Sequence, residues 1–118
     1  MKRIANPELF KDRILTHLRL NTNVDNPKVS RELQKLWNLS DLTIRQAVGL
    51  LRDDGEPFAS GARGFYYATT PDQLEATIDN LQERIAVMSR RRSMLIQAQN
   101  KMKESTGGQR LLFTNLID

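Results

Sequence analysis

The sequence predicts a mainly α-helical fold with one small β-hairpin, followed by a long C-terminal helix. Three observations lead to this prediction. Apolar residues recur at helical spacing in three segments before residue 55. Two short runs rich in aromatic and small residues then flank a Gly-Ala-Arg-Gly turn, as in a hairpin. Beyond residue 70, apolar residues alternate at intervals of four and three, the heptad pattern of a coiled coil.

This pattern divides the chain into a compact domain (1–69), a long heptad-bearing helix (70–104) and a flexible joint with an apolar terminal peptide (105–118). With 118 residues, the chain is long enough for one small domain with an appendage. The net charge of +4 and the pI of about 9.8 suit an anionic partner such as nucleic acid. The lack of cysteine fits a reducing compartment. No apolar run approaches 18 residues, so we expect a cytoplasmic protein that does not associate with membranes.

The first helix is predicted to begin after Asn6, which can act as its N-cap. Pro7 suits the first helical position, and Glu8 complements the helix dipole. An apolar stripe then extends to about Leu20, formed by Phe10, Ile14, Leu15 and Leu18. The Asn- and Asp-rich segment up to Pro27 is typical of a loop.

Two further helices follow, joined by a tight turn. In the first, Ser30 is the expected N-cap and the inward residues are Leu33, Leu36 and Trp37. Asn38 lies at the turn and tolerates the left-handed conformation, so the pair is predicted to form a helix-turn-helix. Ser40 is the expected N-cap of the second helix, accepting a hydrogen bond from the Thr43 N–H, and Gly55 ends that helix.

The helix after Ser40 has two distinct faces. One face is apolar and is expected to lie in the core: Ile44, Ala47, Val48 and Leu51. The opposite face is short and mainly polar, and it carries Leu42, Arg45, Gln46 and Gly49. We therefore expect this outer face to contact a partner.

Residues 29–68, VSRELQKLWNLSDLTIRQAVGLLRDDGEPFASGARGFYYA, resemble the winged helix-turn-helix domains of bacterial and phage regulators and replication proteins. The resemblance covers roughly residues 7–69. Its most specific part is the order of helix-turn-helix, Arg52-Asp53-Asp54-Gly55, hairpin and Gly64-Phe65-Tyr66-Tyr67. Asn38 departs from the family, which often has Gly there. The resemblance implies a winged fold that binds double-stranded DNA, in a bacterium or in the host cytoplasm of a phage.

Base-edge chemistry suggests a role for each residue on the outer face. Gln46 can bond adenine through two atoms, Arg45 can pair with guanine or a phosphate, and Leu42 can meet a thymine methyl group. Gly49 allows close backbone approach, and N–H groups at Ser40 and Thr43 can bind a phosphate. Further DNA contacts are expected at Lys28, Ser30, Arg31 and, at the tip of the hairpin, Arg63. Alternatively, these are solvated polar residues, or the winged domain binds a protein.

The long helix carries a heptad seam at Leu74, Ile78, Leu81, Ile85, Met88, Arg92, Leu95, Gln99 and Met102. A helix of roughly 34 residues is about 50 Å long, more than a domain of this size can cover. A coiled-coil homodimer would bury the seam. Alternatively, the helix folds back on itself or packs on the first helix of its own chain. The adjacent Arg90, Arg91 and Arg92 are expected to be a solvated face or a phosphate contact.

The last residues form an apolar peptide after the Gly107-Gly108 joint. Gln109, Leu112 and Phe113 resemble the Gln-x-x-Leu-Phe peptides that bind the bacterial replication sliding clamp, although Leu111 departs from the small polar or acidic residue common there. Alternatively, the segment is a short amphipathic helix that packs on its own domain or dimer, or it binds another partner.

Together these features predict a dimeric, sequence-specific DNA-binding protein, either a transcriptional regulator or a replication-associated factor. The alternative is an adaptor that docks on the replication or transcription machinery through its coiled coil or C-terminal peptide. An enzyme, a cofactor and a metal site are not expected, because no catalytic constellation is present and His17 is the only histidine.

Overall fold

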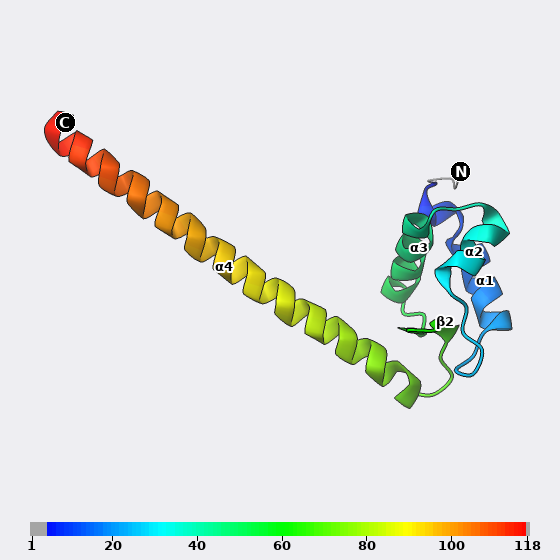
Figure 1. Ribbon diagram of the computed structural model, residues 1–118. Coiled ribbons are helices and arrows are strands. Elements are labelled where there is room, and N and C mark those ends of the chain that lie inside the picture. The colour runs from blue at the N-terminus through cyan, green and yellow to red at the C-terminus, as the bar shows by residue number, and fades with distance from the viewer. Residues whose placement is uncertain (1–4, 118) are drawn as a thin grey trace. The chain divides into compact units, whose positions relative to one another are not determined.

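The computed structural model describes the backbone of residues 5–117 and the side chains of residues 5–106. This part of the chain is mainly helical, with one two-stranded antiparallel hairpin (Figure 1). It divides into two units, Met1–Asp79 and Asn80–Asp118. The first unit therefore includes the beginning of the long helix as well as everything before it.

The first helical segment has two parts where the sequence predicted one helix. Asn6 accepts a hydrogen bond from the Glu8 N–H at 3.0 Å, as expected of a cap, but the helix that it caps is a 3₁₀ turn, Pro7–Leu9. Helix α1, Lys11–Asn21, begins only after Phe10. The predicted stripe is correct, since Phe10, Ile14 and Leu18 are buried and Leu15 packs against them.

Helices α2, Ser30–Trp37, and α3, Asp41–Asp53, are joined by the predicted turn. Asn38 is left-handed, with φ 53°, and Gly55 ends α3 with φ 90°. The Ser40 hydroxyl accepts a hydrogen bond from the Thr43 N–H at 3.1 Å, which confirms this N-cap.

Two expectations for α2 are wrong. Val29 rather than Ser30 occupies the N-cap and makes no side-chain capping bond, because the Ser30 hydroxyl bonds to Asp41 instead. Leu36 is 54% exposed, since Leu33 and Trp37, one turn apart, already turn toward the core from an eight-residue helix.

The core of the first unit lies among α1, α2, α3 and the hairpin. Its fully buried apolar side chains are Ile14, Leu18, Leu33, Leu39, Ile44, Ala47, Val48, Leu51 and Phe58. All four residues of the predicted inner face of α3 belong to this set. The burial of that face leaves the opposite side of α3 at the surface.

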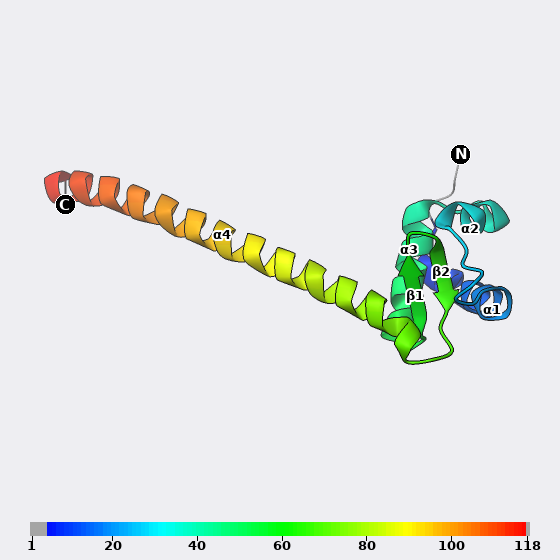
Figure 2. The same cartoon turned by 60° about the horizontal axis from the view of Figure 1, so that its bottom comes forward.

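Strands β1, Phe58–Gly61, and β2, Gly64–Tyr67, lie side by side and run in opposite directions (Figure 2). Gly61 pairs with Gly64 across the turn, as predicted. A further bridge joins Lys28 to Phe65 through two backbone hydrogen bonds of 2.8 Å. The segment before α2 is thereby tied to the outer edge of the hairpin.

Helix α4, Asp72–Ile117, begins within the first unit. Its buried Thr77 hydroxyl accepts from the Ser60 N–H at 3.0 Å, and the Tyr66 hydroxyl donates to the Gln73 carbonyl at 3.0 Å. These bonds explain why the compact unit extends to Asp79 rather than to residue 69. The helix is uninterrupted, so it does not fold back on itself. It also continues through Gly107 and Gly108, where the sequence predicted a break, at a cost of about 1 kcal/mol per glycine relative to alanine.

Candidate nucleic-acid interface

The outer face of α3 is open to solvent along the line that the sequence predicted. Leu42, Arg45 and Gln46 are exposed, and Leu42 retains 53% of its accessible surface. Gly49 is half-buried, and a Cβ at this position would meet no atom within 4 Å. Nothing in the fold itself requires glycine there. The open space over Gly49 leaves room for the close approach of another molecule.

Arg45 is exposed but not freely mobile. Its Nε donates to Asp41 Oδ2 at 2.8 Å, one helical turn back, and its guanidinium lies 6.0 Å from the centre of the Phe65 ring. The first contact is an i, i+4 ion pair, and the second is at the outer limit of a cation–π interaction. Both contacts hold the guanidinium near the turn end of the hairpin, where Phe65 lies, with 61% of the side chain still exposed.

Asp41 joins α2 to α3. Its Oδ1 accepts a hydrogen bond from the Ser30 hydroxyl, which in turn accepts one from Gln34 Nε2 at 3.1 Å. The hydrogen bond from Ser30, followed by that from Arg45, lowers the pKa of the Asp41 carboxyl below its ordinary value. The carboxylate is therefore ionised at neutral pH and holds Arg45 through charge. The sequence pattern did not predict this link, because Ser30 and Asp41 are eleven positions apart in the chain.

Two of the residues expected to contact DNA are buried. Thr43 is fully buried, its N–H bonds to Ser40, and its hydroxyl contacts both Ser40 and the Ala5 backbone. Ser30 is 9% exposed, and Asp41 and Gln34 occupy its hydroxyl. Ser40 is half-buried and caps α3. Ser30 and Thr43 therefore support the helices rather than a partner-binding surface.

The predicted basic residues around α3 are accessible to different degrees. Arg31 is exposed on the first turn of α2. Lys28 is half-buried, and its Nζ lies 3.7 Å from Glu32. Arg63 is exposed in the turn of the hairpin, where its Nη2 donates to the Asp25 carbonyl at 3.5 Å. All three therefore present positive charge at the surface, with Lys28 partly neutralised.

Six apolar residues of the heptad seam are exposed in α4. They are between 40% and 71% accessible: Ile78, Leu81, Ile85, Met88, Leu95 and Met102. Leu74 is half-buried and belongs to the first unit. Arg92 and Gln99 are also exposed. The single chain thus leaves a long apolar stripe in contact with water.

The predicted partner peptide is at the C-terminal end of the chain. The side chains of Gln109, Leu112 and Phe113 lie outside the described residues.

Among the side chains that are described, no three His, Asp or Glu residues are placed to hold a metal ion. None of the described helices combines the length and apolar character that spanning a bilayer requires.

The chain was compared with protein-family models, with curated proteins and with solved structures, and none of the three comparisons gave a match.

Proposed function

We propose that this protein binds double-stranded DNA sequence-specifically through the outer face of α3, as a dimer held together by α4. The observation that carries the proposal is the separation of α3 into a buried apolar face and an exposed face bearing Leu42, Arg45 and Gln46. An arginine and a glutamine one position apart offer the two side chains best suited to read guanine and adenine in the major groove.

The arrangement around α3 supports a winged helix-turn-helix assignment for the first unit. Two helices meet at the left-handed Asn38, and a hairpin follows the second helix. The bridge between Lys28 and Phe65 adds a third extended segment to that hairpin. In this fold, α3 would enter the groove while the hairpin turn with Arg63 and the start of α2 with Arg31 contact the backbone.

The acidic C-terminal end of α3 limits how this helix can lie in a groove. Asp53, Asp54 and Glu56 lie at that end and would repel phosphates. The proposed base-reading residues all lie in the first two turns, so we place the first half of α3 in the groove. Ser30 and Thr43 are left out of the proposed interface because they are buried.

The exposed seam of α4 supports the dimer. Burying a large apolar side chain contributes about 1.5–3 kcal/mol, so pairing six such residues with a second copy is favourable. A dimer would engage two half-sites, which doubles the number of base contacts.

A duplex-binding titration tests the DNA contact. The double variant Arg45→Ala with Gln46→Ala should lower specific affinity by at least about tenfold, since each paired base contact contributes about 1–3 kcal/mol. The matched control is Arg90→Ala with Gln97→Ala, which removes the same residue types and charge from exposed positions on α4 outside the heptad seam. Equal losses of affinity in both variants would mean that the loss reflects only the lower net charge of the protein. Unchanged binding in the first variant would contradict the proposal.

Sedimentation of the full chain tests the dimer. Ile85→Asp should produce a monomer, because it places a charge in the apolar seam. Ala86→Asp puts the same side chain at the neighbouring exposed position outside the seam, and it should leave the dimer intact. A monomeric wild-type chain would contradict this part of the proposal.

One observation favours the adaptor as a second candidate function. Leu42 is 53% exposed at the start of the proposed reading face, and an apolar residue there also suits a protein partner. Its replacement by alanine should weaken duplex binding if Leu42 meets a thymine methyl group. Loss of partner capture from a lysate with unchanged duplex binding would favour the adaptor.

A further inference from the structure

We propose that the α4 coiled coil is a parallel, in-register pair of helices. This inference rests on the dimer proposed above and adds the direction of the second chain. In a parallel pair, the N-terminal ends of the two α4 helices lie at the same end of the coiled coil. Each α4 begins within its own DNA-binding unit, so both units are attached at that end. An antiparallel pair would separate those ends by the length of the overlap.

The heptad register follows from the spacing of the exposed residues. Intervals of four and three place Ile78 and Ile85 at a positions, together with the polar Arg92 and Gln99. The d positions are all apolar: Leu81, Met88, Leu95 and Met102. In parallel coiled coils, β-branched residues at a with Leu at d favour the two-stranded form, and Ile78, Ile85, Leu81 and Leu95 fit this pattern.

The polar a positions discriminate between the two directions. In a parallel pair, every residue faces its own copy, so residues 78–102 form six wholly apolar layers, two from a positions and four from d positions. In an antiparallel pair, each layer joins an a residue to a d residue. Each helix supplies only Ile78 and Ile85 as apolar a residues, so no antiparallel register of this segment forms more than four apolar layers.

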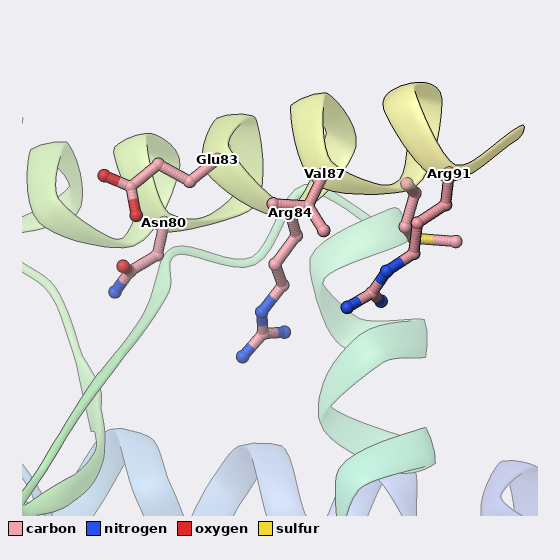
Figure 3. Close-up of a pocket in the computed structure, with 6 residues that line it drawn as sticks. Asn80, Glu83, Arg84, Val87 and Arg91 are labelled. Atoms are coloured by element: carbon pink, nitrogen blue, oxygen red, sulfur yellow. The ribbon is translucent and has the colours of Figure 1, made fainter. Parts of the chain in front are cut away.

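Charge at the edges of the seam points to the same direction. Arg84 and Arg91 occupy successive g positions, and Figure 3 shows both projecting from the same side of α4. A parallel pair places g residues opposite e residues of the second helix, which matches Arg84 with Ser89 and Arg91 with Ile96. These pairs bring no like charges together, and the Arg91 stem can pack on the partly exposed Ile96.

Antiparallel pairs instead place g residues opposite g residues. Three antiparallel registers reach the maximum of four apolar layers with the exposed seam residues. The first opposes Arg84 to Arg84, the second Arg84 to Arg91, and the third Arg91 to Arg91. Each of these antiparallel registers therefore has fewer apolar layers than the parallel pair, and in each the guanidinium groups of the two helices repel one another.

The parallel arrangement has one unfavourable layer, at Arg92, which faces its own copy. The long arginine stem can lie along the seam while the guanidinium reaches water, and this limits the repulsion. A polar a residue of this kind also penalises shifted registers, because any shift would bury it against an apolar partner. Arg92 and Gln99 thus fix the alignment of the two helices.

Distances between labels in the full-length protein test the direction. The chain has no cysteine, so Glu83→Cys, Gln97→Cys and Glu104→Cys each introduce a single site for a spin label. All three are f positions on the outer side of the coiled coil. A parallel pair predicts the same label-to-label distance at each site by pulsed EPR. In an antiparallel pair, the axial separations of the labels differ among the three sites by about 20 Å or more.

A charge substitution gives a second, independent readout. Ser89→Glu places a carboxylate opposite Arg84 only in the parallel pair, and it should lower the dimer dissociation constant several-fold, as expected for about two exposed ion pairs. Ser93→Glu is the matched control, because this exposed b position does not face the second helix. Unequal EPR distances, or no gain from Ser89→Glu over Ser93→Glu, would overturn the parallel direction and leave DNA binding untouched. A chain that stays monomeric would overturn the dimer itself.

Discussion

Gly64→Ala should strongly destabilise the first unit, because two independent features require glycine at this position. Gly64 has φ 117°, a conformation that residues with a side chain rarely adopt. An added Cβ would also lie 2.3 Å from the Lys28 carbonyl oxygen, far inside van der Waals contact. The obstacle is backbone, so it cannot move aside by a rotamer change. The segment at Lys28 must therefore separate from the hairpin.

The size of the effect follows from what is lost. A strained backbone conformation costs about 1–3 kcal/mol, and the two backbone hydrogen bonds between Lys28 and Phe65 contribute about 0.5–1.5 kcal/mol each. We therefore expect a loss of about 2–6 kcal/mol in the free energy of unfolding, out of a typical total of about 5–15 kcal/mol. For a unit of this size, that corresponds to a fall in Tm of at least about 10 °C.

Fluorescence of Trp37 during urea or thermal unfolding is a suitable assay, because Trp37 is the only tryptophan and its ring contacts His17 within the first unit. Gly61→Ala is the matched control, since Gly61 ends the other strand, has no positive φ, and a Cβ there meets nothing within 4 Å. If Gly64→Ala were as stable as Gly61→Ala, the bridge between Lys28 and the hairpin would not hold the unit together as described.

Three further predictions concern single positions in the first unit. Gly49→Ala should raise the stability of α3 by about 0.5–1 kcal/mol, because a Cβ fits there, and should weaken duplex binding; stabilisation with unchanged affinity would remove Gly49 from the interface. Thr77→Val should cost about 1–3 kcal/mol in the free energy of unfolding, since it leaves the Ser60 N–H without its acceptor; an unchanged urea midpoint would contradict this. The pKa of Asp41 is lower in the folded state than in the unfolded state. Its contribution to stability is therefore present above the unfolded pKa and is lost as the pH falls through the folded pKa. The difference in Tm between wild type and Asp41→Asn should be constant from pH 7 to pH 5 and shrink below about pH 4. A difference that grows in acid would contradict the assigned role of Asp41.

The sequence was most informative about features that depend on neighbouring residues. The N-cap at Ser40, the left-handed Asn38, the end of α3 at Gly55 and the hairpin turn were all predicted. Each of them depends on a few consecutive residues and their backbone preferences. The division of α3 into an inner and an outer face was predicted for the same reason, since helical spacing alone sorts its residues.

Two of the expectations that failed involve residues whose partners lie elsewhere in the chain. Ser30 has the composition of a cap, but Asp41, eleven positions later, takes its hydroxyl. The compact unit was expected to end at residue 69, but bonds from Ser60 and Tyr66 hold the first turns of α4 to the hairpin. Helical propensity and capping patterns cannot report such pairings, because they describe only local preferences.

By itself, then, the sequence determined helices α2 and α3, the turn between them, the hairpin and the heptad seam, because each is specified by the order of apolar, polar and glycine residues along a short stretch. Only the tertiary structure decided that Ser30 and Thr43 are buried, that Asp41 holds Arg45, and that Gly64 lies against the backbone of Lys28. The physical reason is that burial and contact between distant residues depend on how the elements pack, and that packing is set by the whole core at once.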